Sequence, residues 1–160
     1  MRRILTFLCL LACLCLGACG VREADFFEVF RAGYVAELTG TAYGQEFSAR
    51  LEMGAATDTG VPPATLTFYA PSTLAGTVLS RAADGSVTLS YGDVSTALPS
   101  GAGETLFSLF PTAGAIELAE VCENGHTRVV SGKVEWELLA DGTPYAVKTA
   151  DVTATVVKWQ

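Results

Sequence analysis

Few side chains in this sequence have the type and spacing that chemistry would need. The single histidine, His126, ends the segment Glu123-Asn124-Gly125-His126, whose Asn-Gly pair is typical of a turn. A catalytic triad or a multi-histidine metal site would have to be built on this one residue, so we interpret it as a solvent-facing turn residue. The sequence also has no Gly-x-Ser-x-Gly elbow, no phosphate-binding glycine loop and no dinucleotide-binding fingerprint.

Carboxylates are the second possible source of chemistry. Glu135 and Glu137 alternate along one expected strand, and Glu117, Glu120 and Glu123 precede them. Paired carboxylates could act in glycoside hydrolysis, but alternating carboxylates are also what the solvent-facing side of a sheet carries. We favour the second interpretation. We therefore predict that the protein is not an enzyme and that it uses no metal or other cofactor.

The start of the chain predicts export. Arg2 and Arg3 precede an uncharged, mostly apolar run from Ile4 to Leu16, which is the pattern of a secretory signal peptide. The run is shorter than the roughly 20 apolar residues that a membrane-spanning helix needs. It ends in Leu16-Gly17-Ala18-Cys19, an aliphatic residue and two small residues before a cysteine. This segment resembles the lipobox of bacterial lipoproteins.

The lipobox resemblance makes Cys19 the residue with the most specific expected chemistry. It implies that residues 1–18 are removed as a signal peptide and that residues 19–24 form a tether, with a diacylglyceryl group (palmitate or a similar acyl chain) on Cys19. Two acyl chains, at roughly 0.8 kcal/mol per buried methylene, hold a protein on a bilayer. We thus expect an exported lipoprotein anchored to the cell membrane or another envelope membrane. The alternative is an ordinary secretory signal followed by an incidental cysteine.

Composition limits the partners of the remaining chain. Residues 25–160 suffice for one domain. The sequence contains 10 Lys and Arg against 17 Asp and Glu, so nucleic acid is an improbable partner and attachment to membranes would depend on the acyl anchor. Once Cys19 is acylated and the signal peptide is removed, Cys122 is the last thiol. We expect it to be a small, half-buried strand residue rather than a reactive nucleophile.

Alternating apolar and polar residues indicate a sheet with one buried face. Clear runs include 34–39, 46–53 and 133–139, and Asp84-Gly85 predicts a hairpin. Phe26, Phe27 and Phe30 fit one face of a short helix over 24–31, and a second short helix is expected over 101–110. We predict a mostly β, α+β domain. It would be a curved antiparallel half-barrel meander of about eight or nine strands, with both helices on the concave side.

This order of elements resembles the half-barrel of the outer-membrane lipoprotein carrier proteins, LolA and LolB. The resemblance is carried by the lipobox, the helix before the first strand, the run Leu66-Thr67-Phe68-Tyr69-Ala70-Pro71-Ser72-Thr73-Leu74-Ala75-Gly76, and the Asp84-Gly85 hairpin. Two features depart from the family. Its carriers are unanchored, unlike a chain with Cys19, and its anchored receptor presents an exposed apolar loop residue, for which this sequence has no clear counterpart.

The resemblance implies a non-enzymatic, lipid-binding module with a concave apolar face that takes up acyl chains or another apolar ligand. The candidate ligand-binding residues on that face are Phe47, Leu51, Leu66, Phe68, Leu89 and Trp136. The alternative is an envelope interaction protein whose core is filled by its own side chains and whose surface binds a protein partner. An open apolar cavity on the usual scale of ligand pockets, roughly 300–1,000 Å³, would favour the first hypothesis.

Overall fold

The computed structural model describes residues 23–57, 60–99 and 101–160. The predicted signal peptide, Cys19 and the tether up to residue 22 lie outside the described residues. The first described element, α2 (Glu23–Arg31), begins one residue before the helix expected from the phenylalanine spacing. Within the described ranges, no helix combines the length and the apolar character needed to cross a bilayer.

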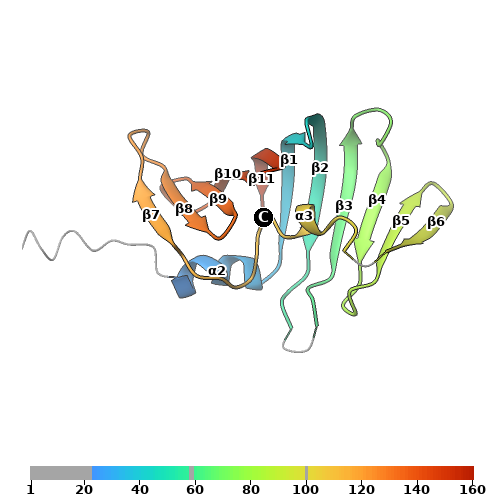
Figure 1. The fold of residues 1–160 in the computed structure, drawn as a ribbon, viewed down its shortest axis with the longest axis horizontal. Coiled ribbons are helices and arrows are strands. Elements are labelled where there is room, and N and C mark those ends of the chain that lie inside the picture. The colour runs from blue at the N-terminus through green and yellow to red at the C-terminus, as the bar shows by residue number, and fades with distance from the viewer. Residues whose placement is uncertain (1–22, 58–59, 100) are drawn as a thin grey trace, which may run out of the picture.

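The described residues form one curved antiparallel sheet of eleven strands, in the order β6-β5-β4-β3-β2-β1-β11-β10-β9-β8-β7 (Figure 1). The mostly β class and the curved meander are confirmed, but the expected number of eight or nine strands was too low. The strands are β1 (Tyr34–Ala42), β2 (Gln45–Met53), β3 (Ala64–Ala70), β4 (Thr77–Arg81), β5 (Val87–Tyr91), β6 (Val94–Leu98), β7 (Leu118–Val121), β8 (Thr127–Ser131), β9 (Val134–Leu138), β10 (Pro144–Lys148) and β11 (Val152–Trp159).

Strand β6 is the strand that sequence patterning misses. It pairs only with β5 at the edge of the sheet, and Val94 is 71% exposed. Strand residues alternate in polarity only where one face is buried and the other is wet. An edge strand that is mostly exposed has no such alternation, so the sequence contains no periodic signal for it.

Two meanders meet in the middle of the sheet. The chain runs outward from β1 to β6, returns at the opposite edge as β7, and runs inward to β11, which pairs with β1. Gly40 lies at this seam, where a Cβ atom would clash with the Thr153 carbonyl oxygen and with the backbone of Ala154. The close approach of β1 and β11 therefore requires glycine at position 40.

The chain crosses the concave face on its way from β6 to β7. This crossover segment, residues 101–117, contains the short helix α3 (Glu104–Phe107) and passes in front of the middle strands (Figure 1). At roughly 3.3 Å per extended residue it is long enough to span most of a sheet whose strands are about 4.8 Å apart. Both helices lie on the concave side, as predicted.

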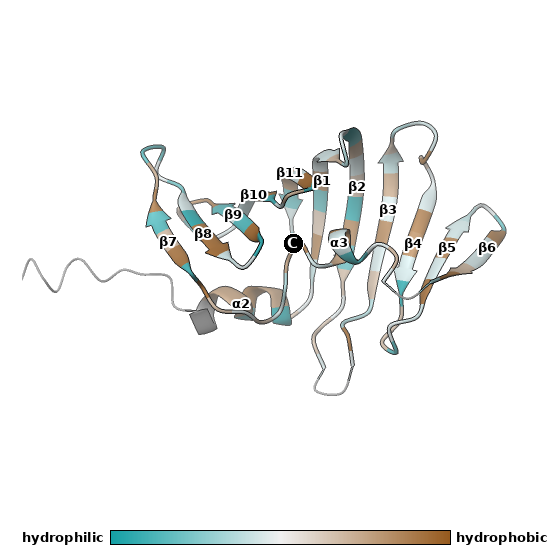
Figure 2. Cartoon of the chain, viewed as in Figure 1, coloured by the Kyte–Doolittle hydropathy of each residue, from teal (hydrophilic) through white to brown (hydrophobic). Residues whose placement is uncertain are grey.

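Apolar side chains from the sheet, α2 and the crossover segment form one core. Figure 2 shows hydrophobic and hydrophilic residues alternating along many of the strands. The inward-facing residues of β1 and β2, such as Ala36, Leu38, Ala49 and Leu51, are buried, while their neighbours are partly or fully exposed. The predicted face of α2 is also buried, with Phe26, Phe27 and Phe30 all at 5% exposure or less.

A β-bulge brings Trp159 into this core. Val152, Ala154 and Val156 face inward along β11, so strict alternation would turn Trp159 outward. The pairing with β1 slips between Glu37 and Leu38, which leaves Val157 without a partner residue and reverses the alternation beyond it. Trp159 then stacks on Tyr34 with ring centroids 4.6 Å apart.

The convex face carries the expected carboxylates in a network with basic and amide side chains. Arg128 donates to Glu120 and Glu135 at 3.1 and 2.8 Å, and the hydrogen bond from Arg128 lowers the pKa of Glu135. Glu137 accepts hydrogen bonds from Asn124 and pairs with His126 at 2.7 Å, and these contacts lower its pKa. A general acid of a glycosidase needs a raised carboxyl pKa. The acidic strand positions therefore fit a solvated sheet face.

Substitutions in α2 test its role in the core. Phe30 is 1% exposed and contacts the rings of Phe26, Phe110 and Trp159, whereas its neighbour Val29 is 44% exposed. We expect Phe30→Ala to lower the free energy of unfolding by about 3–5 kcal/mol, because it leaves a cavity in a packed core. Val29→Ala should change it by less than about 0.5 kcal/mol. Equal effects in urea unfolding would contradict this assignment of faces.

Candidate functional site

The six predicted ligand-binding residues lie on the concave face or at its margin, and they are largely covered. Leu51, Leu66 and Trp136 are 0% exposed and Phe47 is 6% exposed. Phe68 and Leu89 are partly buried against the same core. None of the six lines the pockets described below. The structure thus brings the six residues into one apolar face, and that face is filled by side chains of the chain itself.

The crossover segment supplies much of this filling. Phe107, Leu109 and Phe110 are 2%, 0% and 1% exposed. The segment is not a strand of the sheet, and side-chain contacts connect it to the elements below. Trp136 Nε1 donates to the Leu109 carbonyl oxygen at 2.8 Å, and the Tyr43 and Thr105 hydroxyl groups are 3.1 Å apart. Arg31 Nε of α2 also donates to the Thr112 carbonyl oxygen at 2.9 Å, and at the end of the segment the Glu117 N–H donates to the Val130 carbonyl oxygen of β8 at 2.8 Å. Residues 104–113 themselves belong to no strand.

One charged residue interrupts the apolar face. Arg81 belongs to the inward-facing set of β4 with Thr77 and Leu79, and only 7% of it is exposed. Across the neighbouring strands, Arg81 pairs with Ala64, Ala64 with Met53, and Met53 with Tyr34. The small Ala64 leaves room for the Arg81 side chain, which reaches Met53 across β3.

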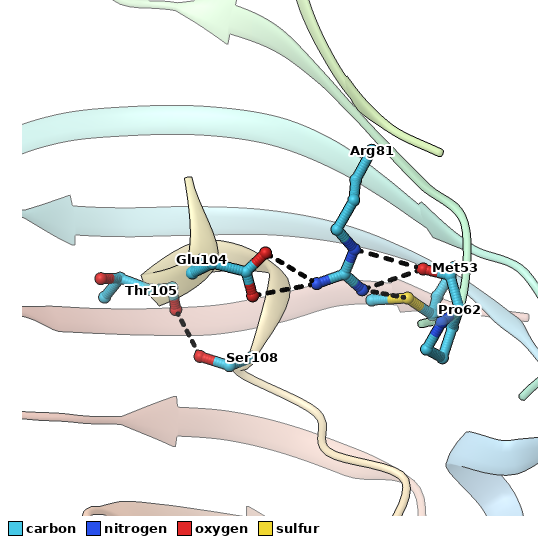
Figure 3. A network of polar contacts seen from close by, with 6 residues as sticks. All are labelled: Met53, Pro62, Arg81, Glu104, Thr105 and Ser108. Carbon is cyan, nitrogen blue, oxygen red and sulfur yellow. Dashed lines mark hydrogen bonds and ion pairs between the residues drawn. The ribbon is translucent and has the colours of Figure 1, made fainter. Parts of the chain in front are cut away.

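The guanidinium group of Arg81 has partners on two sides (Figure 3). Its Nε and Nη2 atoms donate to the Pro62 carbonyl oxygen at 3.2 and 3.0 Å, and Nη2 is 3.6 Å from the Met53 sulfur. Nη1 faces α3 and donates to both carboxylate oxygens of Glu104, at 3.2 and 3.0 Å. The guanidinium carbon also lies 4.9 Å from the centroid of the Phe107 ring. Arg81 thus joins the sheet to the crossover segment.

A pocket of about 230 Å³ opens beside this residue. It is lined by Met53, Pro62, Arg81, Phe107 and Phe110, with Ser108 and residues 111–113. The lining combines apolar side chains with one buried cation, which is the chemistry of a site for an amphiphilic anion. A wider groove of about 690 Å³ lies at the same end of strands β1 to β4. Its lining also includes Arg81, together with inward-facing residues such as Tyr34 and outward-facing ones such as Glu52.

Tyr34, which pairs with Met53 across β1 and β2, is the second unusual polar residue on the inward face. It is 4% exposed, and its hydroxyl group has no hydrogen-bond partner among the described residues. Burial raises the pKa of this hydroxyl, and the positive charge of Arg81 opposes that rise. The group therefore stays neutral under ordinary conditions and contributes an unpaired hydroxyl to the core.

His126 and Cys122, the other residues considered from the sequence, lie among contacts typical of a structural role. His126 follows the Asn124-Gly125 turn and is only partly exposed, because it packs against Tyr145 and pairs with Glu137. Cys122 is half-buried, as predicted, but it follows the end of β7 and belongs to the turn before β8, so its assignment to a strand was wrong. Among the described residues, no group of three or more His, Cys, Asp or Glu side chains is placed to hold a metal ion.

Sequence reasoning did not single out Arg81, Glu104 or Tyr34. One signal for Arg81 was available, because it occupies an inward position in the alternation Thr77, Leu79, Arg81. A charge in the buried phase of a strand is uncommon and marks a position with a special partner. Glu104 had no comparable signal, because only the folded chain brings it to Arg81.

Comparisons with known proteins support the fold and nothing more specific. No protein-family model and no curated protein matches the chain. Among solved structures, it is similar to an uncharacterized conserved protein from Thermus thermophilus, with 15% identity, a TM-score of 0.50, and coverage of 83% of this chain and 80% of that one.

Two further solved structures superpose less well. A putative outer membrane lipoprotein-sorting protein domain from Vibrio parahaemolyticus has 9% identity and a TM-score of 0.46, covering 88% of this chain and 91% of that one. A DUF1329 family protein from Desulfovibrio piger has 8% identity and a TM-score of 0.43, covering 82% of this chain and 75% of that one.

Removal of the Tyr34 hydroxyl group tests its unpaired state. We expect Tyr34→Phe to leave the free energy of unfolding unchanged or to raise it by up to about 1 kcal/mol, because a buried hydroxyl without a partner is costly while the ring packing is retained. Tyr91→Phe, on a residue that is 63% exposed, is the control and should change it by less than about 0.5 kcal/mol. A loss above about 1 kcal/mol in thermal or urea unfolding of Tyr34→Phe would show that the hydroxyl has a partner.

Proposed function

We propose that this protein is a membrane-anchored, non-enzymatic lipoprotein of the cell envelope that binds an acyl chain or a similar apolar ligand on its concave face. The observation that carries the proposal is the crossover segment. Phe107, Leu109 and Phe110 cover the apolar face from residues 104–113, which belong to none of the eleven strands. Ligand would replace these side chains while the eleven-stranded sheet stays intact.

Approximate energies set the size of ligand that this exchange needs. Withdrawing three large apolar side chains from the core costs roughly 5–9 kcal/mol, at about 1.5–3 kcal/mol each. An acyl chain gains about 0.8 kcal/mol for each methylene that it buries. Roughly a dozen buried carbons are enough to offset the displacement, so long-chain ligands fit this mechanism and short ones do not.

Two resemblances found in the sequence also support an anchored, lipid-binding protein. The lipobox resemblance implies a lipid anchor on Cys19, which would hold the domain beside the source of its ligand. The resemblance to the LolA and LolB half-barrels implies acyl-chain uptake on a concave apolar face. Neither inference depends on the packing of the crossover segment.

A second candidate function is favoured by the same packing. Leu51, Leu66 and Trp136 are completely buried by the chain itself, which is also what a permanently filled core requires. In that case the concave face is purely structural, and the protein acts through its outer surface on an envelope protein. The two functions differ in one property, the ability of the crossover segment to move away from the sheet.

Metabolic labelling tests the anchor. Cells that express the full chain and are fed an alkynyl palmitate should yield a labelled protein, because the resemblance implies acylation of Cys19. The Cys19→Ala variant should lose the label, and Cys122→Ala, which removes the half-buried cysteine of the described domain, should keep it. Label retained in Cys19→Ala would refute lipidation at this position.

Photo-crosslinking tests ligand binding on the concave face. Isolated membranes that contain the full-length protein are irradiated with a palmitate analogue carrying a diazirine and an alkyne. We expect light-dependent labelling of peptides from the concave face and the crossover segment. Glu104→Gln should increase the labelling several-fold, because it removes the ion pair between Arg81 and α3.

The matched control for this experiment is Glu28→Gln. Glu28 is an exposed partner of Arg31 at 3.7 Å on α2, so the same chemical change there should leave the labelling unaltered. Labelling confined to the outer surface, or none, would contradict the ligand-binding function and favour the filled-core interaction protein.

A further inference from the structure

Arg81 carries a positive charge in a place where the fold calls for an apolar residue. It lies on the inward face of the sheet beside Ala64, which in turn pairs with Met53, and only 7% of Arg81 is exposed. Removing a charge from water is costly unless the charge is paired and hydrogen-bonded. In the structure this requirement is met by the Pro62 carbonyl oxygen and by the carboxylate of Glu104. The Arg81 site is therefore one that an oxyanion satisfies.

The guanidinium group is held in position by contacts that do not involve its counterion. Two of its nitrogen atoms, Nε and Nη2, are fixed on the Pro62 carbonyl oxygen, and Nη2 also contacts the Met53 sulfur. Only Nη1 is directed to Glu104. If Glu104 moves away, Nη1 remains in place as a donor for another oxyanion.

Glu104 has the properties of an exchangeable partner. It is 45% exposed, whereas Arg81 is 7% exposed, and it lies on the crossover segment together with Phe107. The movement that would uncover the concave face also takes the carboxylate of Glu104 away from Arg81. The buried cation would then be unpaired, and an incoming anion could restore the lost interaction.

We propose that Arg81 binds the oxyanion head group of an amphiphilic ligand, in exchange for the carboxylate of Glu104. This inference rests on the proposed function, because the apolar chain of the ligand would occupy the space vacated by Phe107 and Phe110. The pocket of about 230 Å³ beside Arg81 is smaller than the pockets that enclose whole ligands, roughly 300–1,000 Å³, and suits a head group. The shared chemistry of the ligand is a carboxylate or phosphate on a long apolar chain.

Competition by matched amphiphiles tests this inference on the full-length protein in isolated membranes. Photo-labelling by the diazirine palmitate analogue is competed with dodecanoate, dodecyl phosphate or dodecanol. The readout is the ratio of the half-maximal concentrations of dodecanol and dodecanoate. Comparing this ratio between variants cancels the different partition of the competitors into the bilayer.

We expect dodecanoate to compete better than dodecanol in the wild type, and the ratio to rise about tenfold in Glu104→Gln, where no carboxylate competes for Arg81. In Arg81→Met the preference for the anion should disappear. Arg50→Met, which removes a half-buried cation that pairs with Glu52 on β2, is the control and should keep the wild-type ratio. A simple loosening of the crossover segment would admit both competitors equally and leave the ratio unchanged.

Each other result overturns the inference. If dodecanol and dodecanoate compete equally in all variants, or if the preference survives Arg81→Met, Arg81 does not bind the head group, although the proposed function stands. If no competitor reduces labelling, both proposals fail. Glu104 is half-exposed, so the Glu104→Gln result decides the matter even if Arg81→Met does not fold. Competition by dodecyl phosphate compared with dodecanoate then distinguishes a phosphate head group from a carboxylate.

Discussion

The structure depends on one constraint, the need to cover the apolar face of an open sheet. Eleven antiparallel strands leave one face lined by inward side chains from most of the strands, and a curved sheet that does not close cannot bury that face by itself. Helix α2 and the crossover segment supply the cover, with Phe30, Phe107 and Phe110 at its centre. Residues 104–113 of the cover belong to no strand and are held by packing and a few side-chain hydrogen bonds, which is the basis of the proposal that a ligand exchanges with them.

Arg81 connects this cover to a specific ligand chemistry. Its contacts with Pro62 and Met53 belong to the sheet side, and its contacts with Glu104 and Phe107 belong to the crossover segment. The same residue therefore joins the cover to the sheet, and under the proposed mechanism it would present a cation when the cover is displaced. Hydrophobic burial would supply the affinity in this arrangement, and the charge would select among apolar ligands.

Much of the fold could be predicted from the sequence, because local patterns encode it. The spacing of Phe26, Phe27 and Phe30 indicated the buried face of α2, and alternation located most strands. Strand β6 is exposed except at Leu98, and the bulge opposite Glu37 and Leu38 turns Trp159 inward against its own alternation. The six predicted ligand-binding residues were recognised as one apolar face. Their covering, and the meeting of Arg81 with Glu104, depend on a contact between distant segments that alternation does not reveal.

The central claim, that an apolar ligand displaces the crossover segment, is tested most directly at one hydrogen atom. The indole N–H of Trp136 donates to the Leu109 carbonyl oxygen, and the side chain is completely buried. In the nuclear magnetic resonance spectrum, adding dodecanoate should shift the indole signal and accelerate its exchange with solvent, while the amide signals of β1 and β2 stay protected. A Trp136 indole signal unchanged at saturating dodecanoate would contradict the account.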